Sequence, residues 1–419
     1  MKKVIPLLAI TALLAGALAG CGGNANSSDP TSKKDNVSTE DPKEKVELTM
    51  WTYFENANQK KVLDDWTEGF NGSQSEIEVS HEYVPFADFK KQLSVGLAAN
   101  ELPDVVIIDN PDMASYIAMG LFADITDQIS DWADKDQYFE GPWKSTMLDG
   151  KNYGIPMVSN TLALYYNEDI LANAGVNPPE TWDELREVAK KVTGNGVSGL
   201  GIAAPKTEEG TFQFIPWLLS SGATAEKVDG AEGIRSFTFL ADMIKDGSLA
   251  KESINWTQSD VNKQFMAGKL AMMVNGPWQI PTLESEAPDL KWNVVQIPKD
   301  KQFSSVLGGE NIGVVNGKNV DAAVKFIKYI GQAEIVKQTA IDYGAFPPRM
   351  DVAQDMTWTD DPVLKVFMDA MQYAMPRGPH PQWPEISNAM STALQETLTL
   401  TKTPEQAAKD AQEKIDKID

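Results

Sequence analysis

Strand and helix patterns alternate from residue 46 to residue 119, and this alternation restricts the chain to few folds. Residues 46–51 and 77–83 alternate apolar and polar side chains as strands do, and a helical pattern follows each of them. The run 104–108 is continuously apolar after its first residue, which is typical of a parallel strand covered on both faces. Such repetition predicts an open parallel α/β sheet with right-handed crossovers.

Polar side chains follow two of these predicted strands at the points where the strands end. Phe54, Glu55 and Asn56 come after the first strand, and Asp109 and Asp112 come after the third. Ligands of open α/β sheets bind outside the carboxyl ends of the strands, so these two loops are candidate binding loops. A second interpretation stays open, in which Glu55 and Asp112 only cap the helices that follow them.

The same alternation restarts in the second half of the chain. Residues 181–184 form a capping box that predicts the start of a helix, and the apolar runs 162–166 and 270–274 predict buried strands. Residues 375–384 are rich in Pro and predict irregular structure, whereas residues 403–404 predict the start of the final helix. The sequence therefore predicts two α/β units.

The first residues of the chain have the pattern of an export signal. Lys2 and Lys3 precede the apolar run 4–18, which is too short to serve comfortably as a membrane span. Small residues stand just before Cys21, as they do where lipoprotein signal peptidase cleaves. We therefore expect residues 1–20 to be a lipoprotein signal peptide, and Cys21 to carry acyl chains such as palmitate that anchor the protein to the outer face of the cell membrane. A plain signal peptide with an incidental cysteine is the alternative.

Composition narrows the class of protein further. Residues 21–45 hold almost no side chains that could be buried and predict a flexible tether around Cys21, which, as the only cysteine, can form no internal disulfide. The net charge of −23 argues against nucleic acid as a partner. His81 and His380 are the only histidines, and neither lies in a metal-binding or catalytic-triad pattern. We expect no metal, no cofactor and no catalytic site.

The most distinctive stretch of the chain spans residues 156–173, where a polar pair precedes a buried strand and a short helix. This stretch resembles the signature of the extracellular solute-binding proteins of carbohydrate ABC importers, the group that includes maltodextrin-binding protein. The matching positions are Pro156, Met157, Val158, Ala163, Leu164, Tyr165, Tyr166, Asn167, Leu171 and Asn173. Residues 102–105, 120–126, 179–185 and 275–278 also match, in the family's order, so the resemblance extends from about residue 46 to the end of the chain.

The resemblance implies a fold of two α/β lobes, of the periplasmic-binding-protein type II (cluster D-like) class, joined by hinge segments around a central ligand cleft. It places residues 46–157 and 309–358 in the N-terminal lobe, and residues 158–308 and 359–419 in the C-terminal lobe. It also implies that the protein is a monomer that delivers its ligand to the permease subunits of an ABC transporter.

Carried over position by position, the resemblance implies a sugar site on three parts of the chain. The two loops at the strand ends contribute Phe54, Glu55, Asn56, Asp109 and Asp112, and the distinctive stretch contributes Asn160. The further candidates are Trp217, Trp278, Gly309, Glu310, Asn311, Arg349 and Trp383. The loop after the third strand lacks the tryptophan and arginine of maltodextrin binders, so the ligand need not be a maltodextrin.

Three functions fit these residues to different degrees. Capture of a mono- or oligosaccharide uses carboxylates and amides for the hydroxyl groups and tryptophans for the C–H faces. A secreted glycoside hydrolase would need a pair of carboxylates, and no pair stands out from the many acidic residues. A binding protein for a glycerophosphodiester or another polyol phosphate would use Arg349 and Arg377, although the acidic candidates Glu55, Asp109 and Glu310 argue against an anion.

Overall fold

The computed structural model describes residues 45–418. The predicted signal peptide, Cys21 and nearly all of the predicted tether lie outside the described residues. Residues 44–419 cluster as one compact unit. No helix of residues 45–418 is both long and apolar enough to cross a membrane.

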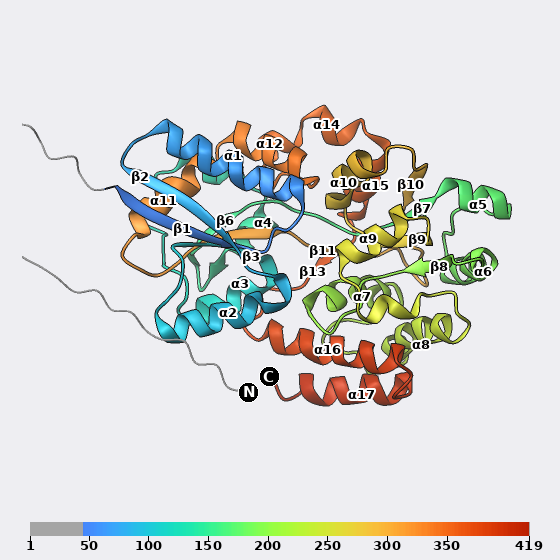
Figure 1. Ribbon diagram of the computed structural model, residues 1–419. Helices are drawn as coiled ribbons and strands as arrows, with labels where there is room; N and C mark the ends of the chain where they lie inside the picture. Colours follow the sequence, from blue (N-terminus) through green and yellow to red (C-terminus); the bar gives the residue numbers. More distant parts are fainter. Residues whose placement is uncertain (1–44, 419) are drawn as a thin grey trace, which may run out of the picture. The chain divides into compact units, whose positions relative to one another are not determined.

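The first lobe is built on a five-stranded sheet with the strand order β2-β1-β3-β12-β6 (Figure 1). Its strands are β1 (Val46–Thr52), β2 (Ile77–Tyr83), β3 (Val105–Asp109), β6 (Gly154–Pro156) and β12 (Glu310–Val314). The helices that pack on this sheet or on one another around it are α1 (Ala57–Ser73), α2 (Phe86–Ala99), α3 (Asn110–Ala118), α4 (Glu140–Ser145), α11 (Val320–Ile330), α12 (Ala333–Tyr343) and α13 (Met350–Ala353). A 3-10 turn (Ala133–Gln137) and the hairpin β4 (Met147–Leu148) and β5 (Lys151–Asn152) complete this lobe.

The prediction of a wholly parallel sheet is wrong for this lobe. β1 pairs in parallel with β2 and β3, as expected, but β12 runs antiparallel to both of its neighbours, β3 and β6. β3 and β6 end at the edge of the sheet that faces the second lobe, whereas β12 begins there because it returns from that lobe. A strand that re-enters at this edge has to run away from it, so the sheet is mixed.

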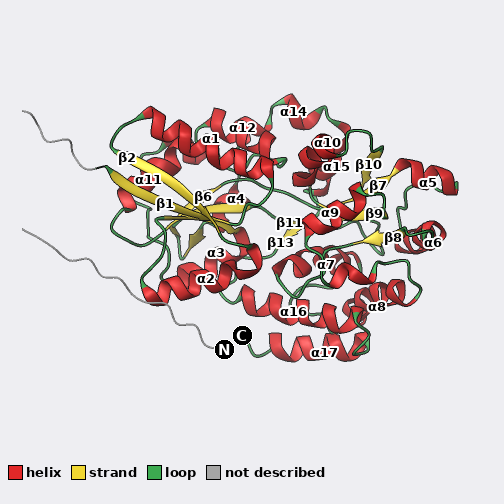
Figure 2. Cartoon of the chain, in the orientation of Figure 1, coloured by secondary structure: helices red, strands yellow, loops and turns green. Residues whose placement is uncertain are grey.

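The second lobe is built on a four-stranded sheet with the strand order β10-β7-β9-β8, and it is also mixed (Figure 2). Its strands are β7 (Ala163–Asn167), β8 (Ser198–Gly201), β9 (Leu270–Asn275) and β10 (Trp292–Val295), of which only β8 and β9 pair in parallel. Its helices are α5 (Glu168–Ala174), α6 (Trp182–Val192), α7 (Glu208–Ser220), α8 (Ala231–Lys245), α9 (Gln258–Met266), α10 (Ile280–Glu286), α14 (Met356–Thr359), α15 (Pro362–Ala370), α16 (Trp383–Leu398) and α17 (Pro404–Ile415), with 3-10 turns at Lys251–Ile254 and Pro277–Gln279.

The distinctive stretch of residues 156–173 connects the two sheets. β6 ends at Pro156 in the first sheet, and β7 begins at Ala163 in the second. Between them, Ser159 and Asn160 form isolated antiparallel bridges to Phe346 and Gly308. Three segments that are far apart in sequence are therefore held together by backbone hydrogen bonds between the lobes. The lobe boundaries that we predict at 157/158, 308/309 and 358/359 stay a prediction.

Gly309 has a backbone conformation that the crossing requires. Its φ is +143°, a conformation that side chains rarely tolerate, and a Cβ atom there would collide with the carbonyl oxygen of Val158. The neighbouring residue Gly308 leaves room for the side chains of Asn160 and Phe212. The two glycines thus allow two backbone segments to pass closely at the junction.

The proline-rich segment 375–384 is more regular than predicted. β13 (Ala374–Pro376) pairs in parallel with β11 (Ser305–Leu307), and α16 begins at Trp383. Pro384 lies in the first turn of α16, where a missing N–H group costs no helical hydrogen bond, so proline there starts a helix and does not prevent one. In contrast, the predicted capping box of residues 181–184 and the N-cap Thr403 are confirmed.

Candidate ligand-binding site

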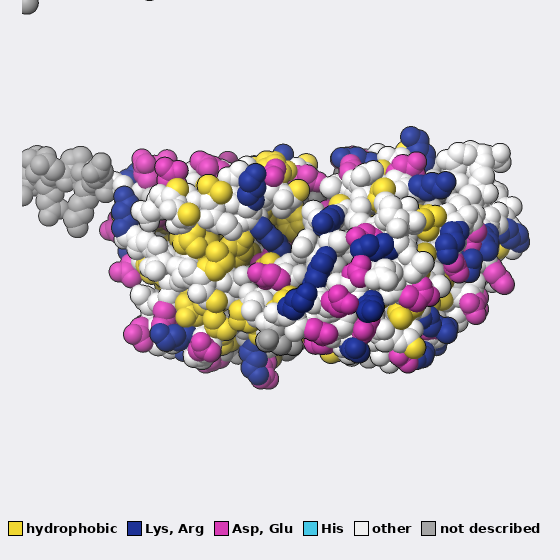
Figure 3. All heavy atoms as spheres, turned by 90° about the horizontal axis from the view of Figure 1, so that it is seen from below, with side chains coloured by type: hydrophobic (Ala, Val, Ile, Leu, Met, Phe, Trp, Pro, Cys, Tyr) yellow, Lys and Arg dark blue, Asp and Glu magenta, His cyan; other side chains and the backbone are white. Residues whose placement is uncertain are grey.

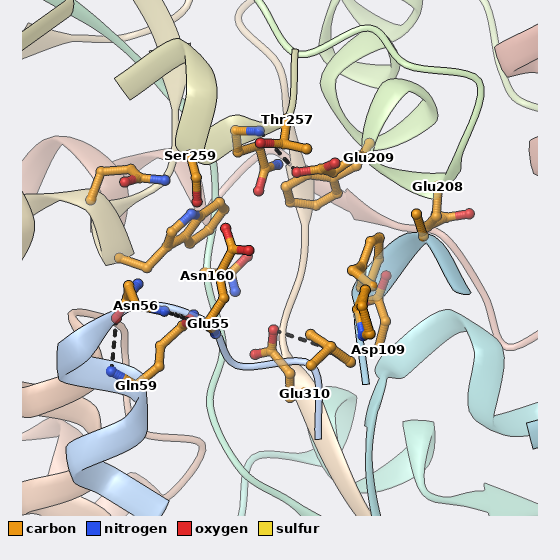
Figure 4. Close-up of a pocket in the computed structure, with 18 of the residues that line it drawn as sticks. Glu55, Asn56, Gln59, Asp109, Asn160, Glu208, Glu209, Thr257, Ser259 and Glu310 are labelled. Atoms are coloured by element: carbon orange, nitrogen blue, oxygen red, sulfur yellow. Dashed lines mark hydrogen bonds between the residues drawn. The ribbon is translucent and has the colours of Figure 1, made fainter. Parts of the chain in front are cut away.

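A cavity of about 220 Å³ lies between the two lobes, at the edge where the strands of both sheets end or begin. Figure 4 shows side chains that point into it from several elements. The first lobe and the crossing segments contribute Tyr53, Glu55, Asn56, Gln59, Tyr83, Pro85, Phe86, Ala87, Asp109, Asn160, Gly309, Glu310, Tyr343 and Arg377. The second lobe contributes Glu208, Glu209, Phe212, Thr257, Gln258, Ser259, Trp278 and Gln279.

The loop between β1 and α1 brings Glu55 and Asn56 to the cavity. Asn56 is the N-cap of α1: its Oδ1 accepts from the backbone N–H of Gln59 at 2.8 Å, and the Gln59 side chain accepts from the backbone of Asn56 in return. The alternative in which Glu55 caps this helix is therefore wrong. Because Asn56 does the capping, the exposed carboxylate of Glu55 is free to face the cavity.

Two carboxylates lie side by side at the cavity because two strands meet there. Glu310, the first residue of β12, is paired in register with Asp109, the last residue of β3. Oε1 of Glu310 accepts from the hydroxyl groups of Tyr343, at 2.9 Å, and Tyr53, at 3.5 Å. Oε2 has no partner among the described residues, although the residue is only 8% exposed. Burial, followed by the charge of Asp109, raises the pKa of Glu310 to about 8.

Arg377 joins the lobes at one end of the cavity. Its Nη1 and Nη2 donate to the two carboxylate oxygens of Asp109, each at 2.6 Å, and Nη1 also donates to Glu208 at 2.8 Å. Its guanidinium lies 4.4 Å from the ring centroid of Phe212. Only Nε of Arg377 lacks a partner within residues 45–418. Asp109 comes from the first lobe and Glu208 from the second, so this ion-pair network spans the junction.

Further partners surround the same network. Lys90 Nζ lies 2.8 Å from Asp112 and 3.6 Å from Glu208, and the indole N–H of Trp383 donates to Glu208 at 3.0 Å. Burial raises the pKa of Glu208, but the charges of Lys90 and Arg377 outweigh it and hold that pKa below its usual value. Glu208 is therefore an ionised carboxylate whose Oε1 accepts two hydrogen bonds and whose Oε2 has only the ion pair with Lys90.

The second lobe covers the cavity with two aromatic rings and a carboxylate. Phe212 of α7 and Trp278 lie with ring centroids 6.2 Å apart, and both are largely buried. Glu209, also on α7, accepts through Oε1 from the backbone N–H of Gln258 at 2.9 Å. Burial first, and then the nearby charge of Glu55, raise the pKa of Glu209 to about 7, against the effect of that hydrogen bond.

Comparison with known proteins identifies the family. Residues 65–366, well over half of the chain, match the bacterial extracellular solute-binding proteins. The chain belongs to this family. The maltotriose-binding protein of Pyrococcus abyssi (strain GE5 / Orsay) is 28% identical over 338 residues, which cover 77% of this chain and 71% of that protein.

Solved structures of related proteins agree with the fold. An ABC transporter solute-binding protein from Thermotoga lettingae, bound with α-D-tagatose, has a TM-score of 0.83 and 27% identity, and the match covers 89% of this chain and 99% of that one. A maltose-bound protein of T. maritima has a TM-score of 0.82 at 23% identity, over 89% and 100% of the two chains. The predicted family and the predicted two-lobed α/β fold are confirmed.

The structure of this solute-binding protein brings seven of the predicted site residues together. The residues that line the cavity are Glu55, Asn56, Asp109, Asn160, Trp278, Gly309 and Glu310. Contact of these side chains with a ligand stays a prediction.

Six predicted site residues do not line the cavity. Two of them are core aromatics: Trp217 is 0% exposed and packs against Trp182 and Phe239, and Phe54 is 1% exposed and packs on Tyr343. The positions of the other four follow from their partners: Asp112 is held by Lys90, Asn311 by Ser145, Arg349 by Asp134, Asp351 and Gly331, and Trp383 by Glu208. Trp217 lies inside α7.

Sequence reasoning missed many cavity residues, among them two groups in the second lobe. Glu208 and Glu209 form the first turn of α7, which begins three residues before the aromatic run that predicted a helix start at 211. Acidic residues in a first turn are a recognised helix-start signal and could have extended that helix backwards. The second lobe's Thr257, Gln258 and Ser259 stand at the start of α9, where the capping box of Thr257 and Asp260 could have indicated a helix start. The sequence does not indicate that this helix start reaches the cavity.

Proposed function

We propose that the chain is the substrate-binding component of an ABC importer and that it captures a sugar or an oligosaccharide in the cavity between its lobes. The single observation that carries this proposal is the composition of the cavity, in which aromatic rings from both lobes surround buried acceptors without partners. The rings are Tyr53, Tyr83, Phe86, Phe212 and Trp278. The acceptors are Oε2 of Glu310 and Oδ1 of Asn160, which is 3% exposed.

A sugar satisfies both features at once. Its apolar C–H faces pack on aromatic rings, and its hydroxyl groups donate hydrogen bonds to carboxylate and amide oxygens. A buried acceptor without a partner costs about 1–3 kcal/mol. A ligand hydroxyl group that donates to Glu310 or Asn160 would remove this cost. A phosphate fits poorly, because Arg377 and Arg349 are already held by carboxylates.

Binding would couple to movement of the lobes. The ligand would contact Glu55, Tyr53 and Glu310 on one side and Phe212 and Trp278 on the other, so a closed arrangement offers contacts that an open one lacks. A ligand that binds the closed form better shifts the population towards it. The closed protein would then deliver its cargo to the permease subunits, as a monomer anchored to the outer face of the membrane through acylated Cys21.

Calorimetric titration of the full chain with a panel of mono- and oligosaccharides tests the proposal. We expect at least one sugar to bind with a dissociation constant near 1 µM, which corresponds to about −8 kcal/mol. Trp278→Ala should weaken this binding, whereas Trp358→Phe, a change in a buried residue outside the cavity, should leave it unaltered. If no carbohydrate binds, capture of a sugar is wrong.

A further inference from the structure

Acidic side chains outnumber basic ones at the cavity. Five carboxylates line it, from Glu55, Asp109, Glu208, Glu209 and Glu310, and Arg377 is the only cationic side chain that does so within residues 45–418. Arg377, with Lys90 behind it, is already paired with Asp109, Glu208 and Asp112. The remaining three carboxylates have no Lys or Arg side chain within 4.0 Å in the described part of the chain.

Two of these three carboxylates belong to opposite lobes. Glu55 follows β1 in the first lobe, and Glu209 lies in the first turn of α7 in the second. Figure 4 shows them on opposite sides of the same space, with Glu310 below them. The charge of Glu55 is one of the causes that raise the pKa of Glu209, as expected for two facing negative charges. Closure of the lobes would increase this repulsion unless a positive charge lay between the carboxylates.

A second observation also calls for a ligand that donates hydrogen bonds here. Oε2 of Glu310 and Oδ1 of Asn160 are buried acceptors without partners in the same cavity. The only buried donor group of the cavity without a partner, among the described residues, is Nε of Arg377. An ion bound by protein groups alone does not account for the pattern, because residues 45–418 contain no group of three or more His, Cys, Asp or Glu side chains placed to hold a metal.

We infer that the ligand of this cavity is a sugar that carries a basic amine, with its ammonium group between Glu55 and Glu209 and its hydroxyl groups on Asn160 and Glu310. This inference rests on the proposed function and adds the chemical class of the sugar. An ammonium group donates three hydrogen bonds and no acceptor, which matches a site that is rich in acceptors and poor in donors. It also replaces the repulsion between the lobes by two charge-assisted hydrogen bonds, so the ligand itself favours closure.

Matched sugar pairs test the inference. Glucose, galactose, mannose and cellobiose are titrated into the full chain beside glucosamine, galactosamine, mannosamine and chitobiose, together with their N-acetylated forms, at pH 7 and low salt. We expect at least one amine to bind about tenfold or more tightly than both its hydroxyl and its acetamido counterpart, since one charge-assisted hydrogen bond exceeds 1.4 kcal/mol. Raising the ionic strength should reduce this preference.

Variants that remove single charges locate the ammonium group. Glu55→Gln and Glu209→Gln should each weaken binding of the amine sugar more than binding of its neutral counterpart, and so remove most of the preference for the amine. Glu187→Gln, on the exposed face of α6 and outside the cavity, is the matched control and should keep the preference. Equal or tighter binding of the hydroxyl or acetamido sugar, or a preference that survives both variants, overturns the amine inference and leaves sugar capture intact. Absence of binding to every sugar contradicts the proposed function and the inference together.

Discussion

The carboxylates at the two ends of the cavity differ in whether a cation is paired with them. At one end, which we call the paired end, Asp109, Asp112 and Glu208 are buried against Arg377 and Lys90. At the other, the open end, Glu55, Glu209 and Asn160 face the cavity without a cation, and Glu310, which lies beside Asp109 at the border between the two ends, has no cation either. Both ends are rich in carboxylates, but those of the paired end already have cationic partners, whereas those of the open end have none.

The difference shows that the number of buried charges does not identify a binding site. A buried carboxylate with a cation on it is a structural element, because its desolvation is offset within the protein. A buried carboxylate with one unpartnered oxygen can accept a hydrogen bond from a ligand. On the face drawn in Figure 3, by contrast, acidic and basic side chains are interspersed.

The largest expected effect is at the paired end. Arg377→Met leaves Asp109 and Glu208 buried without their cation, and loss of one member of a buried ion pair costs about 3–5 kcal/mol. Chemical denaturation at pH 7 measures the free energy of unfolding. The matched control is Lys402→Met, which removes exposed ion pairs to Glu396 and Asp410 and should cost less than about 1 kcal/mol. Equal effects of the two changes would contradict the structural role of the paired end.

A second comparison separates stability from binding within the stretch that joins the lobes. Tyr165 is 0% exposed and donates to the carbonyl of Gly276 at 2.7 Å, so Tyr165→Ala should cost about 3–5 kcal/mol of stability, like other large-to-small changes in a core. Asn160→Ala should weaken sugar binding, because the ligand loses an acceptor, and should alter stability little, because Oδ1 has no partner to lose.

Calorimetric titration and denaturation of both variants decide the point. If Asn160→Ala binds sugar as the parent does, Asn160 is not part of the open end. Tyr166, the next residue of the family signature, is only partly buried in β7, so Tyr165 is the better test of stability.

The sequence predicted most of the local structure because local structure follows from short-range patterns. The helix expected over residues 86–99 coincides with α2, and the strand expected over 77–83 coincides with β2. The direction of β12 could not be predicted in this way. It depends on where the chain re-enters the first lobe, which is a property of the whole fold and not of residues 310–314.

The site was predicted unevenly for a related reason. Glu55 and Asp109 were found because they follow strands, and strand ends gather at one edge of a sheet. Glu209 and Arg377 line the same cavity, but the sequence neighbours of Glu209 suggest a helix start and those of Arg377 suggest an irregular loop. Glu209 and Arg377 line the cavity only because α7 and the segment after β13 pack against the first lobe.

A smaller effect concerns the pH dependence of stability at the open end. The pKa of Glu310 is about 8 in the folded protein and rises from an ordinary value of 4.5, so between pH 4.5 and 8 the unfolded chain is ionised while the folded one keeps its proton. The free energy of unfolding should therefore fall as pH rises through this window. Glu310→Gln cannot ionise and should lose less stability than the parent between pH 5 and pH 9.

Denaturation of the ligand-free parent and Glu310→Gln at these two pH values measures the difference. Identical pH profiles of the two proteins would mean that the pKa of Glu310 is not raised by its burial in the folded protein. Glu405→Gln, at an exposed position of α17, is the control and should follow the parent.

The smallest expected effect concerns Asn56, which has a role in the fold and also lines the cavity. Asn56 caps α1 and also faces the cavity, so Asn56→Ala should cost about 1 kcal/mol of stability through the lost cap. Asn56→Asp keeps an oxygen for the backbone N–H of Gln59 and should keep that stability. It replaces the NH₂ group, which could donate to a sugar, by a carboxylate oxygen, which cannot. Sugar affinity that falls in Asn56→Asp at unchanged stability would place the amide in contact with the ligand beside the open end, whereas unchanged affinity would limit Asn56 to its capping role.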